Sequence, residues 1–195
     1  HNLVPDGTHA QRYAPVLKRE PRWFCGPRHA LLGPAYADLP EFVVRPEVSS
    51  IGIFMGGTDP GGASAEVLSA CRLAGFAGAI EIASTRAAPT LAALQAAVTA
   101  DGHARLSLDL PDLAAFYGRH DLQIGAGGGA AWERCAVGAP SLTLALADNQ
   151  RAVIPALVQL GATATAAGTA PAHIAAALHP LLADAAVRLR LSQTA

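Results

Sequence analysis

Between residues 51 and 191 the chain alternates short apolar runs with segments of helical periodicity. The predicted strands are Ile51–Met55, Ala79–Ala83, Ala104–Leu108, Leu122–Gly125, Ser141–Leu146 and Thr163–Ala166. The predicted helices are Ala63–Ala74, Leu91–Ala100, Pro111–Tyr117, Ala130–Val137, Asn149–Leu160, Pro171–Leu178 and Pro180–Leu191. Strands that alternate with helices form a parallel sheet with helices on both faces. Right-handed crossovers then favour a Rossmann-like α/β fold with the strand order 3-2-1-4-5-6.

Composition agrees with the α/β fold class and argues against nucleic-acid and membrane partners. Hydrophobic residues make up 51% of the chain and aromatic residues only 5%, so the core is expected to contain small aliphatic side chains. The formal net charge is −1 and no basic cluster is present, which argues against a nucleic-acid partner. No apolar run approaches the roughly 20 residues that span a bilayer, so no membrane partner is expected either.

Cysteine and histidine spacing bears on metals and on the compartment. The three cysteines lie far apart, and none of the seven histidines forms a metal-binding motif with another residue. We therefore expect no metal site and no cofactor. Sparse, unpaired cysteines are typical of a reducing compartment, and we predict a cytoplasmic protein.

Proline distribution indicates the domain organisation. Many of the prolines fall within residues 1–48, which show little periodicity. We predict that residues 1–48 are an interdomain linker and the segment leading into the domain, and that residues 49–195 form the Rossmann-like domain.

Two glycine-rich turns follow the first and the fourth predicted strands. Gly56 and Gly57 follow one, and the glycine loop (Gly125–Gly129) follows the other. In the predicted order these strands are neighbours at the switch point, where ligands bind in such sheets. Unpaired amides at a helix start are suited to a diphosphate, so we single out Gly127, Gly128 and Gly129.

The glycine loop has two alternative interpretations, and Glu133 on the following helix has one. Its sequence formally fits the dinucleotide pattern GxGxxA, although that pattern normally follows the first strand. The glycines alternatively serve only a tight turn and close packing. Glu133 lies on the helix that follows, with its carboxylate directed back toward the loop, and is a candidate for sugar hydroxyls; the alternative is a surface glutamate favoured by the helix dipole.

Polar residues near two other strand ends complete the candidate site. The amides of Gly57 and Thr58 face a phosphate from the opposite wall in this interpretation, whereas Asp59 alternatively caps the following helix. Asn149 and Gln150 suit sugar hydroxyl and acetamido groups, or else belong with Asp148 to a helix cap.

Three motifs together resemble a known family. They are Phe54–Pro60, the Gly125–Cys135 stretch that ends in Trp-Glu-Arg-Cys, and Ala147–Gln150. They resemble the UDP-2,4-diacetamido-2,4,6-trideoxy-β-L-altropyranose hydrolases of pseudaminic acid biosynthesis, which are similar to two-domain GT-B glycosyltransferases. The pattern differs at Gly129, where the family commonly has serine, and at Gly33–Tyr36, which replaces Arg-Pro-Glu-Phe.

The resemblance implies that this chain is the UDP-binding C-terminal half of such a hydrolase. Gly127–Gly129 would hold the diphosphate, Glu133 the ribose, the backbone near Leu108 the uracil, and Asn149 and Gln150 the sugar. The catalytic histidine would lie in an N-terminal half, which would be the domain's partner. Two alternatives stay open: a GT-B glycosyltransferase donor domain, and an NAD-binding or non-catalytic Rossmann-like module.

Overall fold

The computed structural model describes residues 13–24 and 26–195. Contacts divide the chain into two compact units, His1–Pro34 and Ala35–Ala195. In the first unit, 3-10 helices cover Ala14–Val16 and Pro27–His29, and the ring centroids of Tyr13 and Trp23 lie 6.4 Å apart. A third 3-10 turn covers Pro34–Tyr36. Residues 1–12 and 25, which belong to the predicted linker, lie outside the described part of the chain.

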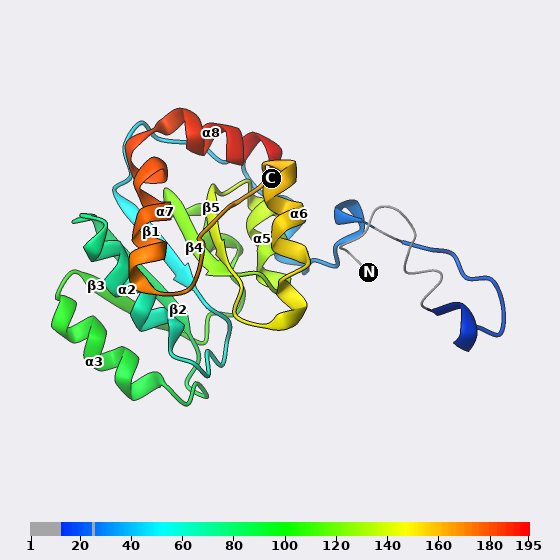
Figure 1. The fold of residues 1–195 in the computed structure, drawn as a ribbon, viewed down its shortest axis with the longest axis horizontal. Helices are drawn as coiled ribbons and strands as arrows, with labels where there is room; N and C mark the ends of the chain where they lie inside the picture. Colours follow the sequence, from blue (N-terminus) through cyan, green and yellow to red (C-terminus); the bar gives the residue numbers. More distant parts are fainter. Residues whose placement is uncertain (1–12, 25) are drawn as a thin grey trace. The chain divides into compact units, whose positions relative to one another are not determined.

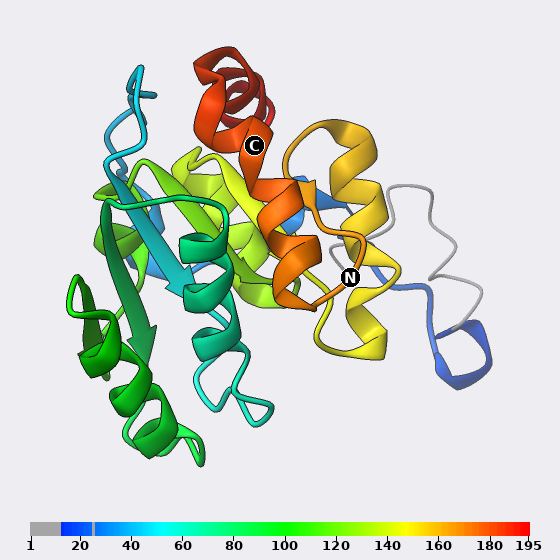
Figure 2. The same cartoon turned by 60° about the vertical axis from the view of Figure 1, so that its left-hand side comes forward.

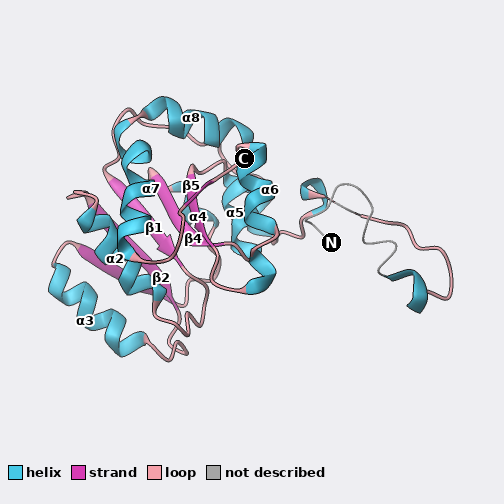
Figure 3. Ribbon diagram, viewed as in Figure 1, coloured by secondary structure: helices cyan, strands magenta, loops and turns pink. Residues whose placement is uncertain are grey.

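The second unit contains a six-stranded parallel sheet in the order β3-β2-β1-β4-β5-β6, which confirms the predicted topology (Figures 1 and 3). The strands are β1 (Ser50–Phe54), β2 (Ala79–Ser84), β3 (Ala104–Leu108), β4 (Leu122–Ala126), β5 (Ser141–Leu144) and β6 (Ala164–Thr165). The central pair β1 and β4 runs in register from Ile51 opposite Leu122 to Phe54 opposite Gly125. The switch point therefore lies between the two strands that precede the glycine-rich turns.

Helices cover the sheet on both faces. They are α2 (Ala63–Leu73), α3 (Leu91–Asp101), α4 (Ala114–Gly118), α5 (Gly129–Val137), α6 (Val153–Leu160), α7 (Pro171–Ala183) and α8 (Ala185–Thr194). Helices α2 and α7 lie in contact and pack on one face of the sheet, which Figure 2 shows from a second angle. Helices α4 and α5 contact each other and bury Phe116, Tyr117 and Val137 in a second, smaller cluster.

Strand alternation separates an apolar face from a polar face. The side chains on the α2–α7 face form one large core: Ile51, Ile53, Ile80, Ile82, Leu122, Ile124, Leu142 and Leu144. The alternating positions carry small or polar residues: Gly52, Glu81, Ala83, Gln123, Gly125, Ser141 and Thr143. Because successive side chains of a strand point to opposite faces, one set of strands produces both surfaces.

Two helix predictions at the C-terminal end are wrong in detail. Helix α7 continues through Pro180 and ends at Ala183, instead of breaking before Pro180. Pro180 is exposed, while Leu178 and Leu181 beside it are buried, so packing holds the helix although one backbone donor is missing. The break comes at Asp184, where the Asp184 carboxylate accepts from the Ala186 amide at 2.7 Å and caps α8.

Three further boundaries differ from the predictions. The predicted helix at Asn149–Leu160 is a 3-10 turn at Asp148–Gln150 followed by α6, which begins at Val153. Strand β5 ends at Leu144, because the Leu146 amide bonds to the Gln150 side chain at 2.9 Å instead of continuing the strand. The helix predicted from Pro111 begins at Ala114, whose amide bonds to the Asp112 carboxylate at 3.0 Å.

Within the second unit, residues 45–50 are bonded to the rest of the domain through charged groups. Arg45 forms an ion pair with the buried Asp121 at 2.6 Å, and Asp121 also accepts from the Ser49 and Ser50 amides. Arg188 of α8 donates to the Arg45 and Pro46 carbonyls at 2.9 and 2.7 Å. These bonds fix the path of the chain into β1. Within the described residues, no helix is long and apolar enough to cross a membrane.

Candidate functional site

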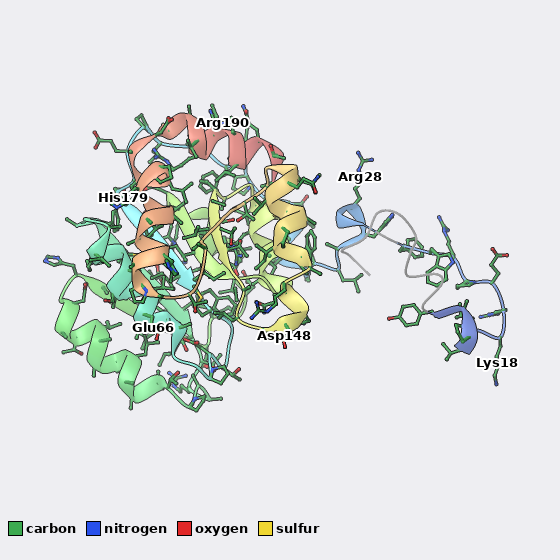
Figure 4. The ribbon with its side chains drawn as sticks, viewed as in Figure 1. Lys18, Arg28, Glu66, Asp148, His179 and Arg190 are labelled. Carbon is green, nitrogen blue, oxygen red and sulfur yellow. The ribbon has the colours of Figure 1, made fainter. Side chains whose placement is uncertain are left out.

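The glycine loop lies at the carboxyl edge of the sheet and contacts the turn after β5. The Gly127 amide donates to the Leu144 carbonyl at 3.0 Å. A Cβ placed on Gly127 would lie 3.4 Å from Gln150 Cβ, and one on Gly128 would lie 3.7 Å from Gln150 Nε2. Figure 4 shows Asp148 at this edge, away from His179 and Arg190. The structure therefore brings the predicted residues 127–129 and 150 together.

Three successive amides at the start of α5 have no partner in the described part of the chain. No described group accepts from Gly128, Gly129 or Ala130, and the first amide of this turn that is bonded belongs to Ala131. Gly128 is the N-cap and has no side chain to satisfy these donors. Free N–H groups and the positive end of the helix dipole together favour an anion at this position.

Packing explains only part of the glycine content. A Cβ on Gly125 would come within 2.2 Å of Arg134 Nη1, and one on Gly127 within 2.6 Å of Ile154 Cδ1. At Gly129 a Cβ would meet nothing within 4 Å, and Gly129 is exposed. The packing alternative thus accounts for Gly125 and Gly127 but not for Gly129, which leaves bare backbone open to solvent.

Glu133 lies one turn into α5 and is half-buried beside two tyrosines. The Tyr117 hydroxyl donates to Glu133 Oε2 at 3.4 Å. Burial raises the pKa of the Tyr117 hydroxyl. The positive charge of Arg134 lowers this pKa and the negative charge of Glu133 raises it. The net pKa is above the usual value, so the hydroxyl stays protonated and can donate. Burial and then the charge of Glu133 raise the pKa of Tyr36 as well.

Sequence reasoning did not identify these tyrosines as neighbours of Glu133. Tyr36 stands where the resemblance expects phenylalanine, and this departure was the one available signal. Tyr117 lies in the short helix α4. Only the packing of α4 on α5 brings Tyr117 close to the Glu133 carboxylate. The hydrogen bond from the Tyr117 hydroxyl therefore engages one oxygen of the Glu133 carboxylate.

Asp59 acts as the helix cap that the sequence offered as the alternative. Its Oδ1 accepts from the Ala63 amide at 2.9 Å and its Oδ2 from the Ser64 amide at 2.8 Å. The residue is buried and adopts a positive φ of 33°. Both carboxylate oxygens therefore serve α2, and Asp59 shapes the turn after β1.

The remaining residues of that turn are arranged differently. Thr58 is exposed. The Gly57 carbonyl accepts from the Thr85 hydroxyl at 2.6 Å, which ties the turn after β1 to the turn after β2. The amide of Thr58 has no acceptor among the described residues and stays a candidate donor.

The turn after β5 presents one fixed and one free amide side chain. Gln150 Oε1 is held by the Leu146 amide, so its Nε2 donors remain for another partner near Gly128. Asn149 is exposed, and no described residue bonds to its side chain. Asp148 does not cap a helix through its side chain and instead pairs with Arg151 at 3.0 Å on the surface.

Leu108 lies away from the glycine loop. It pairs with Ser84 at the end of β3, and strands β2 and β1 stand between β3 and β4. Three strand spacings correspond to roughly 14 Å. The Asp109 amide that follows is bonded to the Ser84 carbonyl at 2.9 Å, which ties this backbone to the end of β2.

Arg134 is a further buried residue to which the sequence assigned no role. It has no exposed surface, and its Nη2 donates to the Ala126 carbonyl at 3.1 Å and to Thr143 Oγ1 at 3.0 Å. The described residues contain no group of three or more His, Cys, Asp or Glu side chains arranged for an ion. A cavity of about 580 Å³ lies between residues 35–45 and α4, and the glycine loop does not line it.

No family model matches the chain, and no curated protein matches it. Solved structures do match. The spinosyn rhamnosyltransferase SpnG is 26% identical over 77% of this chain and 42% of its own, with a TM-score of 0.57. MurG from Acinetobacter baumannii is 19% identical over 77% of this chain and 47% of its own, with a TM-score of 0.57. MnaA from S. aureus, solved with UDP, is 18% identical over 76% of this chain and 40% of its own, with a TM-score of 0.61.

The chain spans less than half the length of these proteins. What they share with it is the fold: the six-stranded parallel sheet in the order 3-2-1-4-5-6 is that of a GT-B C-terminal-like domain.

Proposed function

We propose that this chain is the UDP-binding half of a UDP-sugar hydrolase, with its ligand at the edge where β1 and β4 end. The substrate class suggested by the motif resemblance is a UDP-linked 2,4-diacetamido-2,4,6-trideoxyhexose used in pseudaminic acid biosynthesis. The observation that carries the proposal is the run of free amides at Gly128, Gly129 and Ala130 at the start of α5. Free N–H groups at a helix start suit a diphosphate, and in this proposal they hold it without a metal ion.

The surroundings of these amides fit the rest of such a ligand. Glu133 follows one turn later and would accept hydrogen bonds from the ribose hydroxyls. Gln150 Nε2 and the exposed Asn149 lie on the side of the turn after β5, where they would contact the sugar. The backbone near Leu108 would contact the uracil at the other end of an extended ligand.

In this proposal the chain stabilises the leaving group. Hydrolysis breaks the bond between the anomeric carbon and UDP, and negative charge develops on the departing diphosphate. Amides that are already oriented toward that position stabilise the charge without reorganising. The water-activating histidine belongs to a separate N-terminal half, joined through residues 1–48, and the reaction takes place in the cytoplasm.

A glycosyltransferase donor domain is the second candidate, favoured by the likeness to SpnG and MurG. The donor site would be the same, and the acceptor would be a hydroxyl group instead of water. An NAD-binding module is less well supported. A dinucleotide fingerprint follows the first strand of its unit, whereas here the glycine loop follows β4.

Calorimetric titration of the chain with UDP tests the site. Replacing Glu133 with alanine removes the ribose partner and should weaken UDP binding by about 1–3 kcal/mol, or about 5- to 150-fold. Glu66→Ala, on the exposed side of α2, is the matched control and should leave the affinity unchanged (Figure 4). Equal affinities of the Glu133→Ala variant and the wild type would refute the role of Glu133.

A thermal-shift panel separates the candidate functions. UDP and UDP-GlcNAc should raise the melting temperature, whereas CMP and NAD should not. Stabilisation by NAD alone would favour the dinucleotide module. The 195 residues should bind UDP but not release it from a UDP-sugar, and turnover by this chain alone would contradict the division of the site between two halves.

A further inference from the structure

Arg134 lies beneath the glycine loop with no access to solvent. It occupies the buried side of α5 together with Ala131 and Val137, so its side chain lies between α5 and the polar face of the sheet. Its Nη2 bonds to the carbonyl of Ala126, the last residue of β4, and to Thr143 of β5. The guanidinium is thus held against the strand end that leads directly into the free amides.

The partners of this guanidinium are all neutral. No carboxylate among the described residues forms an ion pair with Arg134, and its Nε and Nη1 atoms are buried without a hydrogen-bond acceptor. The Thr143 hydroxyl is in turn hydrogen-bonded to the Thr163 hydroxyl, with 2.8 Å between the two Oγ1 atoms, and this group is also neutral. A buried charge is normally paired, because an unpaired one loses its hydration without compensation.

Gly125 makes the room for this arrangement. A Cβ at residue 125 would lie 2.2 Å from Arg134 Nη1 and 2.9 Å from the Phe54 carbonyl oxygen. The first glycine of the loop is therefore a packing requirement of the guanidinium, while Gly128 and Gly129 present the amides. The same glycine loop therefore leaves room for the buried Arg134 guanidinium at Gly125 and exposes backbone N–H donors at Gly128 and Gly129.

We propose that Arg134 is a positioning residue that supplies the positive charge of the diphosphate site from below, without touching the ligand. The inference rests on the proposed function and deepens it, since it assigns a counter-charge to the proposed diphosphate site. A diphosphate bound at Gly128–Ala130 would supply the negative charge that balances the guanidinium, which has no anionic partner among the described residues of the free protein. The effect of Arg134 should therefore grow with the charge of the ligand, from uridine to UMP to UDP.

Titration of the chain with uridine, UMP and UDP, followed by NMR chemical shifts, tests this dependence. Arg134→Met removes the charge and keeps an apolar chain of similar length, a replacement that buried ion sites often tolerate. UDP affinity should fall about tenfold, as for a unit charge roughly 10 Å away at an effective dielectric constant of about 20. Uridine affinity should not change, and UMP should lie between the two.

Two further variants separate charge from packing. Arg134→Lys keeps the charge and should retain most of the UDP affinity, whereas Arg134→Gln keeps hydrogen-bond donors and should behave like Arg134→Met. Arg134→Gln also serves if the methionine variant does not fold. The matched control is Arg188→Met, which removes another fully buried arginine, one bonded to Leu181 and Pro46. It should lower stability and leave UDP affinity unchanged.

The outcomes distinguish this inference from the function on which it rests. No UDP binding by the wild-type chain overturns both. UDP binding that the uncharged variants leave unaltered, or that falls together with uridine binding, overturns the role of Arg134 alone.

Discussion

The two faces of the central sheet use the same strands but hold together by different interactions. On the α2–α7 face, aliphatic side chains from β1, β2, β4 and β5 form one continuous core. On the face toward α4 and α5, the alternating positions carry glycine, glutamate, glutamine, serine and threonine. The first face gains stability from apolar burial, and the second depends on hydrogen bonds and ion pairs.

Glu81 shows how the polar face accommodates a charge. The carboxylate is buried, and it is bonded by Arg119, Ser107 and Arg105, while His120 Nε2 lies 3.0 Å away. Burial by itself would raise the pKa of Glu81, but the hydrogen bonds from Arg119, Ser107 and Arg105 outweigh it and lower the pKa to about 2.

Arg134 is the opposite case on the same face. Glu81 has several cationic partners, whereas the partners of Arg134 within residues 13–24 and 26–195 are neutral. The difference matters because Glu81 lies at the middle of β2, away from the ligand edge, and Arg134 lies below that edge. On this face, then, the buried carboxylate is paired with cations, whereas the buried guanidinium below the ligand edge is bonded to neutral groups among the described residues.

The largest effect should come from the apolar face. Ile124 is buried at the centre of the core, and Ile124→Ala should lower the free energy of unfolding by about 2–5 kcal/mol through lost burial and a residual cavity. Urea denaturation measures it, with Leu189→Ala at a half-exposed position as the control. A loss below about 1 kcal/mol would contradict the assignment of this face as the main core.

The second effect is the pH dependence of the free energy of unfolding that arises from Glu81 on the polar face. Because the folded pKa of Glu81 is about 2 and its usual value is 4.5, its contribution is present above pH 4.5 and is lost as the pH falls toward 2. Glu81→Gln should therefore cost about 3 kcal/mol at neutral pH, with the difference shrinking below pH 4.5. Denaturation curves of both proteins between pH 2.5 and 7 measure the difference. A gap that stays constant across this range would show that the ion pairs contribute nothing there.

The smallest effect concerns the close contact at Gly52. A Cβ at residue 52 would lie 2.4 Å from Gln123 Oε1 and 2.8 Å from His120 Nδ1, both buried, so Gly52→Ala should destabilise by about 1–3 kcal/mol. Gly61→Ala meets no atom within 4 Å and serves as the control in the same denaturation series. If the two alanine variants were equally stable, the polar face would be looser than its contacts indicate.

Local sequence signals were sufficient where the structure depends on neighbours in the chain. Hydrophobic periodicity placed all six strands, and the crossover rule gave their order. Asp59 was recognised as a possible cap because a cap bonds to amides only four and five residues away. The glycine loop was found for the same reason, since a run of glycines before a helix is visible without any tertiary contact.

Signals failed where packing outweighed a local preference. Pro180 indicated a break, but the buried Leu178 and Leu181 keep α7 continuous. The polar character of Asp148–Gln150 indicated a helix start, whereas the Gln150 side chain turns back to the Leu146 amide. In both places a contact made in the folded chain outweighs the preference of the residue type.

The sequence by itself determined the α/β class, the strand order and the position of the glycine loop, because periodicity, turn chemistry and chain handedness are local properties. Only the tertiary structure decided that Tyr117 meets Glu133 and that the Arg134 guanidinium lies buried under Gly125 among neutral partners. Those relations depend on which helix packs on which strand, and the energy of a buried charge is set by atoms that are distant in sequence.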